Sequence, residues 1–340
     1  MEFRAYVARR LLQFIVVVFG VIVLAFLVTH VIPGDPVRAL LGPTATFQQV
    51  QALRHQYGLD QPLYLQFLQY FENLFRGNLG VSIFTGNPVT YDLHMFLPAT
   101  LQLVVFAFLI AVALGILFGS IGALTNGRVY DHFIRIFSLI GISTPPFWLG
   151  VIAVILFAVD FRIFPVSGAL SPSLMVSSHV PSVTGFLLID SLLAGQYNVF
   201  YDNLWHLMLP ALVLGFWGTG WISRFVRNSL LEVMHKDYVT MARAKGLTSR
   251  AVFFGHILRN GLIPPMTVMG LTFGYMISGA ITVEIVFAYP GIGLYAYNAF
   301  LNLDYAPIAA FALVVAILFS AVNLAVDLLY PIVDPQIRLE

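Results

Sequence analysis

The sequence predicts an all-α integral membrane protein with six transmembrane helices. Of its 340 residues, 59% are hydrophobic and only 10% are charged, whereas about a quarter of the residues in soluble domains are charged. Six mostly apolar stretches each reach the roughly 20 residues that a helix needs to cross a bilayer: 10–31, 98–124, 134–158, 204–228, 260–287 and 306–330. Because backbone groups must be paired within lipid, stretches of this length are helices and not barrel strands.

The charge pattern predicts that both termini are cytoplasmic. With the N-terminus inside, 13 of the 17 Lys and Arg residues fall in inner segments, and the other four are Arg38, Arg54, Arg76 and Arg162. Cytoplasmic loops carry the excess of Lys and Arg in membrane proteins. The opposite orientation would invert this bias, so we expect a multi-pass protein of the cell (plasma or inner) membrane.

The spans divide the chain into four parts. We expect an N-terminal transmembrane helix at 1–32 and an external region at 33–97. The main transmembrane domain at 98–330 then contains five helices and a cytoplasmic loop at 229–259, and a cytoplasmic tail covers 331–340.

The external region predicts a small helical cap. One run of apolar residues at helical spacing has Thr46 as a possible N-cap and Gly58 just past its end, and a second lies between Pro62 and Gly77. The runs consist of Phe47, Val50, Leu53 and Tyr57, and of Leu63, Phe67, Phe71 and Leu74. The Gly- and Asn-rich stretch that follows, GNLGVSIFTGNP, predicts turns.

The cytoplasmic loop predicts two short helices separated by a sharp turn. Asp237 can cap a helix that begins at Tyr238, and Gly246 can end it because glycine adopts the left-handed conformation at little cost. Thr248 can cap a second helix whose apolar side carries Val252, Phe253 and Ile257.

Two readings of the first loop helix remain open. It is either a linker whose cations hold the topology, or a docking helix for a soluble partner. Ala242 and Ala244 leave little side chain, so a partner surface can approach closely, and Arg243 and Lys245 give the helix a positive rim.

The sequence resembles the permease family of ABC importers. The loop motif ARAKG at 242–246, followed by His256, Leu258, Arg259, Asn260 and Pro264, is similar to the cytoplasmic signature of these permeases in its dipeptide/oligopeptide and nickel variant. Ala242 stands where the general pattern has a glutamate. Further matching stretches are PGDP at 33–36, GNLGVS at 77–82, TPPFWLG at 144–150, VTGFLLIDSLLAGQ at 183–196 and VEIVFAYPGIG at 283–293. The 183–196 stretch is similar to the B-type dipeptide permease.

This resemblance implies a type I ABC importer permease fold and a multi-subunit machine. The implied partners are a second homologous permease, two cytoplasmic ATPases and an external substrate-binding protein. The implied ATPase-coupling residues are Asp237, Tyr238, Met241, Ala242, Arg243, Ala244, Lys245 and Gly246. The chain has no G-x-x-x-x-G-K-S/T motif for cradling ATP, so we expect no cofactor and no enzymatic activity in this chain, with ATP and Mg bound by partner subunits.

The substrate and the class of transporter have alternatives. Dipeptides or short oligopeptides are the first expectation, followed by oligosaccharide, nickel or glutathione. A secondary transporter acting alone would require inverted repeats or midplane charges. A membrane protease would require G-x-S-x-G, H-E-x-x-H or paired intramembrane aspartates, which the sequence lacks.

A few residues within spans are candidates for a gate or a translocation path. Glu284, in the fifth predicted span, is either structurally paired or part of a gate, because intramembrane carboxylates are usually functional or paired. Trp148 and Trp217 either pack or line the path. Asn323 and Asp327 share one helix face and predict interhelical bonding. The eight His residues show no metal-ligand spacing, so we expect no metal site.

Overall fold

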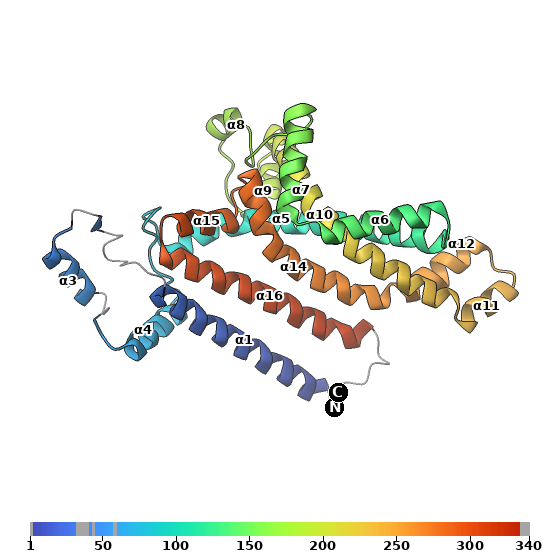
Figure 1. Ribbon diagram of the computed structural model, residues 1–340, viewed down its shortest axis with the longest axis horizontal. Coiled ribbons are helices and arrows are strands. Elements are labelled where there is room, and N and C mark those ends of the chain that lie inside the picture. Colours follow the sequence, from blue (N-terminus) through green and yellow to red (C-terminus); the bar gives the residue numbers. More distant parts are fainter. Residues whose placement is uncertain (1–2, 32–40, 43–44, 57–59, 334–340) are drawn as a thin grey trace.

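The molecule is an elongated bundle of long helices (Figure 1). The computed structural model describes residues 3–31, 41–42, 45–56 and 60–333. The long elements are α1 (Phe3–Val31), α5 (Val89–Leu124), α6 (Val129–Ser143) with α7 (Pro146–Ala153) and the π-helical turn η1 (Val154–Asp160), α10 (Tyr197–Met234), α14 (Ile263–Phe287) and α16 (Tyr305–Val333). The shorter elements are α3 (Phe47–Gln56), α4 (Leu63–Phe75), α8 (Pro172–Ser177), α9 (Leu187–Leu193), α11 (Asp237–Ala244), α12 (Ser249–Val252), η2 (Phe253–Leu258), α13 (Arg259–Gly261) and α15 (Ile292–Leu301).

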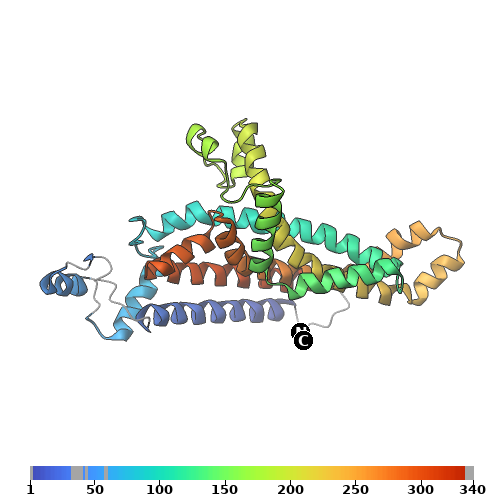
Figure 2. The same ribbon diagram turned by 45° about the horizontal axis from the view of Figure 1, so that its top comes forward.

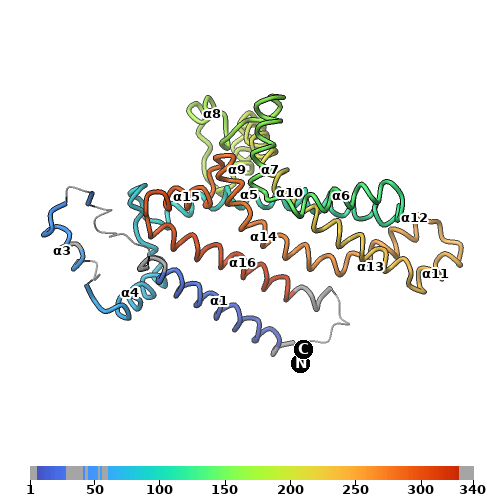
Figure 3. The backbone as a smooth tube through the Cα atoms, viewed as in Figure 1, coloured from blue at the N-terminus to red at the C-terminus, as the bar shows by residue number. Residues whose placement is uncertain are grey.

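The two ends of the bundle carry different short elements. Helices α3 and α4 lie at one end, which we call the cap end, and α11 to α13 lie at the other, which we call the loop end (Figure 3). Helix α1 begins and α16 finishes at the same end, because Tyr6 on α1 donates a hydrogen bond to the Asp327 carbonyl at 3.1 Å. The described helices therefore cross the bundle an even number of times between these two residues.

The third predicted span, 134–158, is sharply bent. Among the described residues, five helices are long and apolar enough to cross a membrane, and a sixth crossing comes from the pair 129–143 and 146–160, whose axes differ by 106°. Pro145 and Pro146 cause the break, since proline supplies no backbone donor and disfavours helix in the residue before it. Figure 2 shows α7 standing away from the bundle while α6 stays along it.

The packing of α5 against α10 requires that the bent pair cross the membrane. Gly115 lies beside Ile222 and Gly119 beside Val226, so both helices run in the same direction with a constant offset. Two parallel spans need one crossing between them, and α6 with α7 and η1 is the segment that connects them. The described part of the chain thus has six spans when the bent pair counts as one.

Glycines bring α5, α6 and α10 into backbone contact. A Cβ added at Gly119 would lie 2.7 Å from Val226 Cβ and 2.8 Å from the Ser223 carbonyl oxygen, and one at Gly220 would lie 2.8 Å from the Ser138 carbonyl oxygen. Small residues permit such close approach between membrane helices. The glycines of the GFWGTG stretch at 215–220 are therefore packing residues.

The cap contains the two helices expected from the sequence. At α3, Thr46 Oγ1 accepts from the Gln49 amide at 3.4 Å while the Gln49 side chain accepts from the Thr46 amide at 2.9 Å, a reciprocal capping box. Helix α4 packs on α1, with the Phe67 and Phe26 ring centroids 5.2 Å apart. Gly77 has a φ of +74° and follows α4 as expected. The expected residues Tyr57, Gly58 and the 33–36 motif lie outside the described residues.

Buried carboxylates hold the turns at the cap end. Asp304 accepts from Ser82 Oγ at 2.7 Å and from the Phe84 amide at 3.1 Å, which fastens the turns after α4 to the start of α16. Asp190 accepts from the Thr184 and Gly185 amides at 2.8 and 3.0 Å. Burial alone raises the pKa of Asp190, but the hydrogen bonds from the Thr184 hydroxyl and from the backbone amides outweigh it, so its pKa lies below the ordinary value.

Two spans begin earlier than the sequence predicted. Helix α5 starts at Val89 instead of 98 and contains Pro98, and α10 starts at Tyr197 instead of 204 and contains Pro210. The added turns are polar, so hydropathy did not include them. They extend the helices beyond the apolar stretch at the cap end.

Candidate functional site

The loop between α10 and α14 forms a rigid helical corner at the loop end. Helix α11 follows α10 after the turn at His235 and Lys236, and α12 with η2 leads back toward the bundle. Thr248 caps α12 as expected, because its side chain accepts from the Ala251 amide at 3.3 Å. Gly246 between the two helices has a φ of +79°, the left-handed conformation that the sequence predicted.

One face of this corner is part of the apolar core. Val239 is fully buried and Ala242 nearly so, and they join Val252, Phe253 and Ile257 in the same core cluster as Leu230 of α10. Gly261 of α13 lies against Leu230, and its carbonyl accepts from Ser229 Oγ at 2.7 Å. A displacement of α11 therefore carries α10 and the start of α14 with it, since close-packed groups do not shift independently.

The opposite face of α11 is exposed. Tyr238 is 41% and Met241 59% exposed, and Arg243, Ala244 and Lys245 are exposed as well. Together these five residues present a cationic, partly apolar surface, which we call the α11 outer face. A surface of this composition is suited to a protein partner, because Met, Tyr and Arg are enriched at protein interfaces.

Two sequence expectations for the loop are wrong. Ala242 does not face a partner, because its side chain points into the core. Asp237 is not the N-cap: Lys236 occupies that position without a side-chain cap bond, and Asp237 is the first helical residue. As an acidic residue in the first turn it still interacts favourably with the helix dipole.

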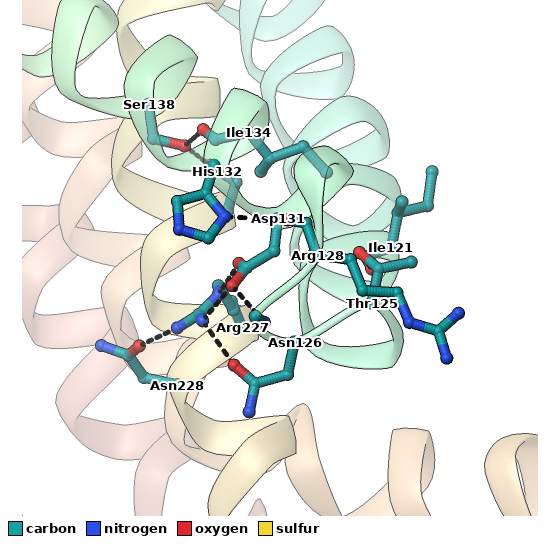
Figure 4. Close-up of polar contacts among 12 residues, drawn as sticks. Ile121, Thr125, Asn126, Arg128, Asp131, His132, Ile134, Ser138, Arg227 and Asn228 are labelled. Atoms are coloured by element: carbon teal, nitrogen blue, oxygen red, sulfur yellow. Dashed lines mark hydrogen bonds and ion pairs between the residues drawn. The ribbon is translucent and has the colours of Figure 1, made fainter.

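An ion pair that the sequence did not reveal braces the loop end just above this corner. Asp131 on α6 accepts from Arg227 Nε at 2.5 Å and Nη2 at 2.8 Å, and also from the Gly127 amide at 3.0 Å. Arg227 Nη2 additionally donates to Asn126 at 3.0 Å (Figure 4). The fork-shaped contact fixes the turn between α5 and α6 on α10. In the sequence, each residue is an ordinary charge at the end of a predicted span. The sequence alone therefore does not indicate that the two residues pair.

Glu284 is enclosed within the chain at the opposite end of α14. It is 0% exposed and accepts from Thr100 Oγ1 at 2.6 Å and from the Gly293 and Leu294 amides at 2.7 and 3.1 Å. A Cβ on Gly291 would lie 2.3 Å from its carboxyl carbon, which explains the glycines of PGIG. Of the two expected roles, this geometry favours structural pairing between α5, α14 and α15.

The two tryptophan candidates lie on different helices and are both partly exposed. Trp148 on α7 is 53% exposed. Trp217 on α10 is half-buried and contacts Trp221 with ring centroids 6.5 Å apart.

The two polar residues of α16 fulfil the expected interhelical role only in part. Asp327 pairs with Arg10 of α1 at 3.1 Å. Asn323 Oδ1 is buried without a hydrogen-bond partner in the described residues. No group of His, Asp and Glu that could hold a metal occurs in the described part of the chain.

Known proteins match this chain over almost its whole length. The family model described as "binding-protein-dependent transport system inner membrane component" matches residues 111–339, and its N-terminal companion matches residues 3–104. The probable D,D-dipeptide transport system permease protein DdpB of Escherichia coli is 44% identical over 337 residues, covering 99% of this chain and 98% of that protein. The di/tripeptide transport system permease protein DppB of Pseudomonas aeruginosa is 43% identical over 335 residues, covering 98% of each.

Among solved structures, one described as an amino acid ABC transporter with histidines aligns with a TM-score of 0.48 at 14% identity, covering 71% of this chain and 94% of that one. The likeness is too low to add to the assignment, which rests on the sequence matches. Those matches confirm the resemblance, and the six-span helical bundle is the type I permease fold expected from it. The chain is a multi-pass membrane subunit of a transport system and not an enzyme, and membership in such a system implies ATPase and substrate-binding partners. The chain therefore belongs to the family of binding-protein-dependent transport system inner membrane components, the permease subunits of ABC importers.

Proposed function

We propose that this chain is the B-type permease subunit of an ATP-driven importer that takes up dipeptides or short oligopeptides. The relatives named as dipeptide and di/tripeptide permeases support this substrate class. In this proposal the chain forms half of a translocation path with a second homologous permease. An external binding protein delivers the peptide at the cap end, and two ATPases bind ATP and Mg at the loop end. Both termini are cytoplasmic.

Force enters this subunit through α11. The observation that carries this step is the division of α11 into a buried face, with Val239 and Ala242, and the exposed α11 outer face. When an ATPase that binds the exposed face moves, the buried face of α11 moves with it. Because Leu230 of α10 belongs to the same core cluster, this movement reaches a helix that runs the length of the bundle.

Replacement of Gly246 tests the coupling role. Gly246 has a φ of +79° with nothing within 4 Å of an added Cβ, so a side chain meets conformational strain but no clash. Gly246→Leu should shift α11 and lower both ATPase association and peptide-stimulated ATP hydrolysis in the reconstituted importer. Gly246→Asn is the matched control, because Asn tolerates the left-handed conformation. Full coupling in the Leu variant would contradict the proposal.

Transport itself is tested with the complete importer in proteoliposomes. Labelled dipeptide should accumulate only when ATP and the binding protein are both supplied. Accumulation of an oligosaccharide, nickel or glutathione in place of dipeptide would show that the proposed peptide substrate is wrong. Accumulation without ATP would support the stand-alone transporter.

A further inference from the structure

The groove between α6 and α10 contains a cavity of about 360 Å³ near the loop end. This volume lies within the range of about 300–1,000 Å³ typical of small-molecule sites. Its polar lining residues are Arg135, Ser138, Ser223, Arg224, Arg227 and Asn228. The functions described above, ATPase coupling and helix packing, leave this cavity without a role.

The cavity has an excess of positive charge. Arg227 is neutralised by Asp131, which accepts two of its hydrogen bonds. Arg135 and Arg224 also line the cavity, and neither makes a hydrogen bond or a close ion pair within the described residues, although Asp131 also attracts Arg135 electrostatically. Two guanidinium groups whose donors are free of hydrogen-bond partners within the described residues and that line one cavity form a site for an oxyanion, because each offers a fork of donors that matches a carboxylate.

The floor of the cavity is preorganised. Ser138 and Ser223 are buried, and their hydroxyl oxygens lie 2.8 Å apart, which joins α6 to α10 within the cavity lining. The Asp131–Arg227 pair fixes the same two helices farther toward the loop end (Figure 4). The helices that carry Arg135 and Arg224 are thus held at a constant separation, as a binding site requires.

An aromatic row runs along α10 and passes next to Arg224, which follows Trp221 by three residues and directly precedes Phe225. The rings of Trp217 and Trp221 have centroids 6.5 Å apart, and those of Trp221 and Phe225 are stacked 6.3 Å apart. Flat aromatic surfaces next to cations match a short peptide, whose side chains are often apolar and whose C-terminus is a carboxylate. An acyl chain of a lipid has no such need for stacked rings.

We infer that Arg135 and Arg224 hold the C-terminal carboxylate of the transported peptide at the inner part of the translocation path. This inference rests on the proposed peptide substrate. It adds a specificity element within the membrane subunit, separate from the external binding protein.

Equilibrium binding to the importer complex without its binding protein tests this. The complex is placed in nanodiscs of phosphatidylcholine, and the probes are labelled Ala-Phe and its C-terminal amide. The wild type should bind the acid at least tenfold more tightly than the amide, a difference of about 1.4 kcal/mol. The double variant Arg135→Gln/Arg224→Gln should bind acid and amide equally, at the level of the amide in the wild type.

Arg250→Gln is the matched control, since Arg250 is also an exposed arginine at the loop end but lies on α12. It should keep the tenfold preference, and thermal unfolding should show that all variants fold. Equal weakening of acid and amide in the double variant, retention of its preference, or no measurable Ala-Phe binding to the wild type would overturn the inference.

A second arm distinguishes the peptide carboxylate from a lipid phosphate. Nanodiscs containing phosphatidylglycerol are analysed by native mass spectrometry. If the double variant loses bound phosphatidylglycerol but still prefers the acid, the cavity holds a lipid headgroup and the inference is wrong. If the wild-type importer accumulates no peptide in proteoliposomes under any condition, the proposed function itself fails; if it accumulates Ala-Phe while the acid preference is absent, only this inference fails.

Discussion

Substitution of Glu284 separates a structural carboxylate from a gating one. In the structure, one carboxylate oxygen accepts from Thr100 Oγ1 and the other from the Gly293 and Leu294 amides. Hydrogen bonds to a charged group contribute about 1.5–3 kcal/mol each and neutral ones about 1 kcal/mol. Gln fits the same space: its oxygen can accept from both amides, and its NH2 group can donate to the Thr100 oxygen. Glu284→Gln should therefore cost roughly 1–4 kcal/mol.

Glu284→Leu removes every acceptor and leaves three buried donors unpaired. Each unpaired donor costs about 1–3 kcal/mol, so this variant should lose roughly 3–9 kcal/mol and fail to fold or to reach the membrane. The assay is thermal unfolding of the purified chain in detergent, followed by transport in the reconstituted importer. Glu284→Gln should unfold at a lower temperature yet transport at a rate near wild type. A Gln variant of unchanged stability that no longer transports would refute the structural role and support the gate.

Three further perturbations test the packing and the charges. Asp131→Asn leaves Arg227 without its buried partner and should lower the unfolding free energy by about 3–5 kcal/mol, measured by chemical denaturation; no change would show that the pair is solvent-screened. Gly119→Ala places a Cβ 2.7 Å from a neighbouring side chain and should cost about 1–3 kcal/mol, while Gly20→Ala, with open space around it, should not destabilise; equal effects would contradict the close α5–α10 contact. Because the pKa of Asp190 is lowered, its stabilising contribution is complete above its ordinary pKa of 3.8 and is lost as the pH falls through the lower folded-state pKa. The unfolding temperatures of wild type and Asp190→Asn should therefore differ at neutral pH and converge in strong acid. A difference that does not depend on pH would exclude ionisation of Asp190 as its cause.

The spans, their number and the loop corner were predictable because they depend on local patterns. Hydropathy identifies any long apolar segment, and Thr248 and Gly246 have local preferences for a cap and a left-handed turn. The bend in the third span was only partly predictable. The proline pair indicates a kink, but the 106° angle depends on how α7 packs beside α14.

Pairings between distant residues were not predictable from one sequence. Asp131 and Arg227 are 96 positions apart, and Thr100 and Glu284 are 184 apart. Nothing local in either pair indicates its partner. The misassignment of Ala242 has the same origin: a short alanine-rich helix has no strong apolar face, so its buried side is decided by the core beneath it.

The most direct test of force transfer through α11 uses single cysteines, because the natural chain has none. Met241→Cys on the exposed face and Val239→Cys on the buried face are introduced separately into the assembled importer, and a short thiol cross-linker is added from the cytoplasmic side. We predict that Met241→Cys cross-links to an ATPase subunit and that Val239→Cys does not. Labelling of Met241→Cys by a membrane-impermeant reagent from outside the cell, or its failure to cross-link any ATPase, would contradict the account.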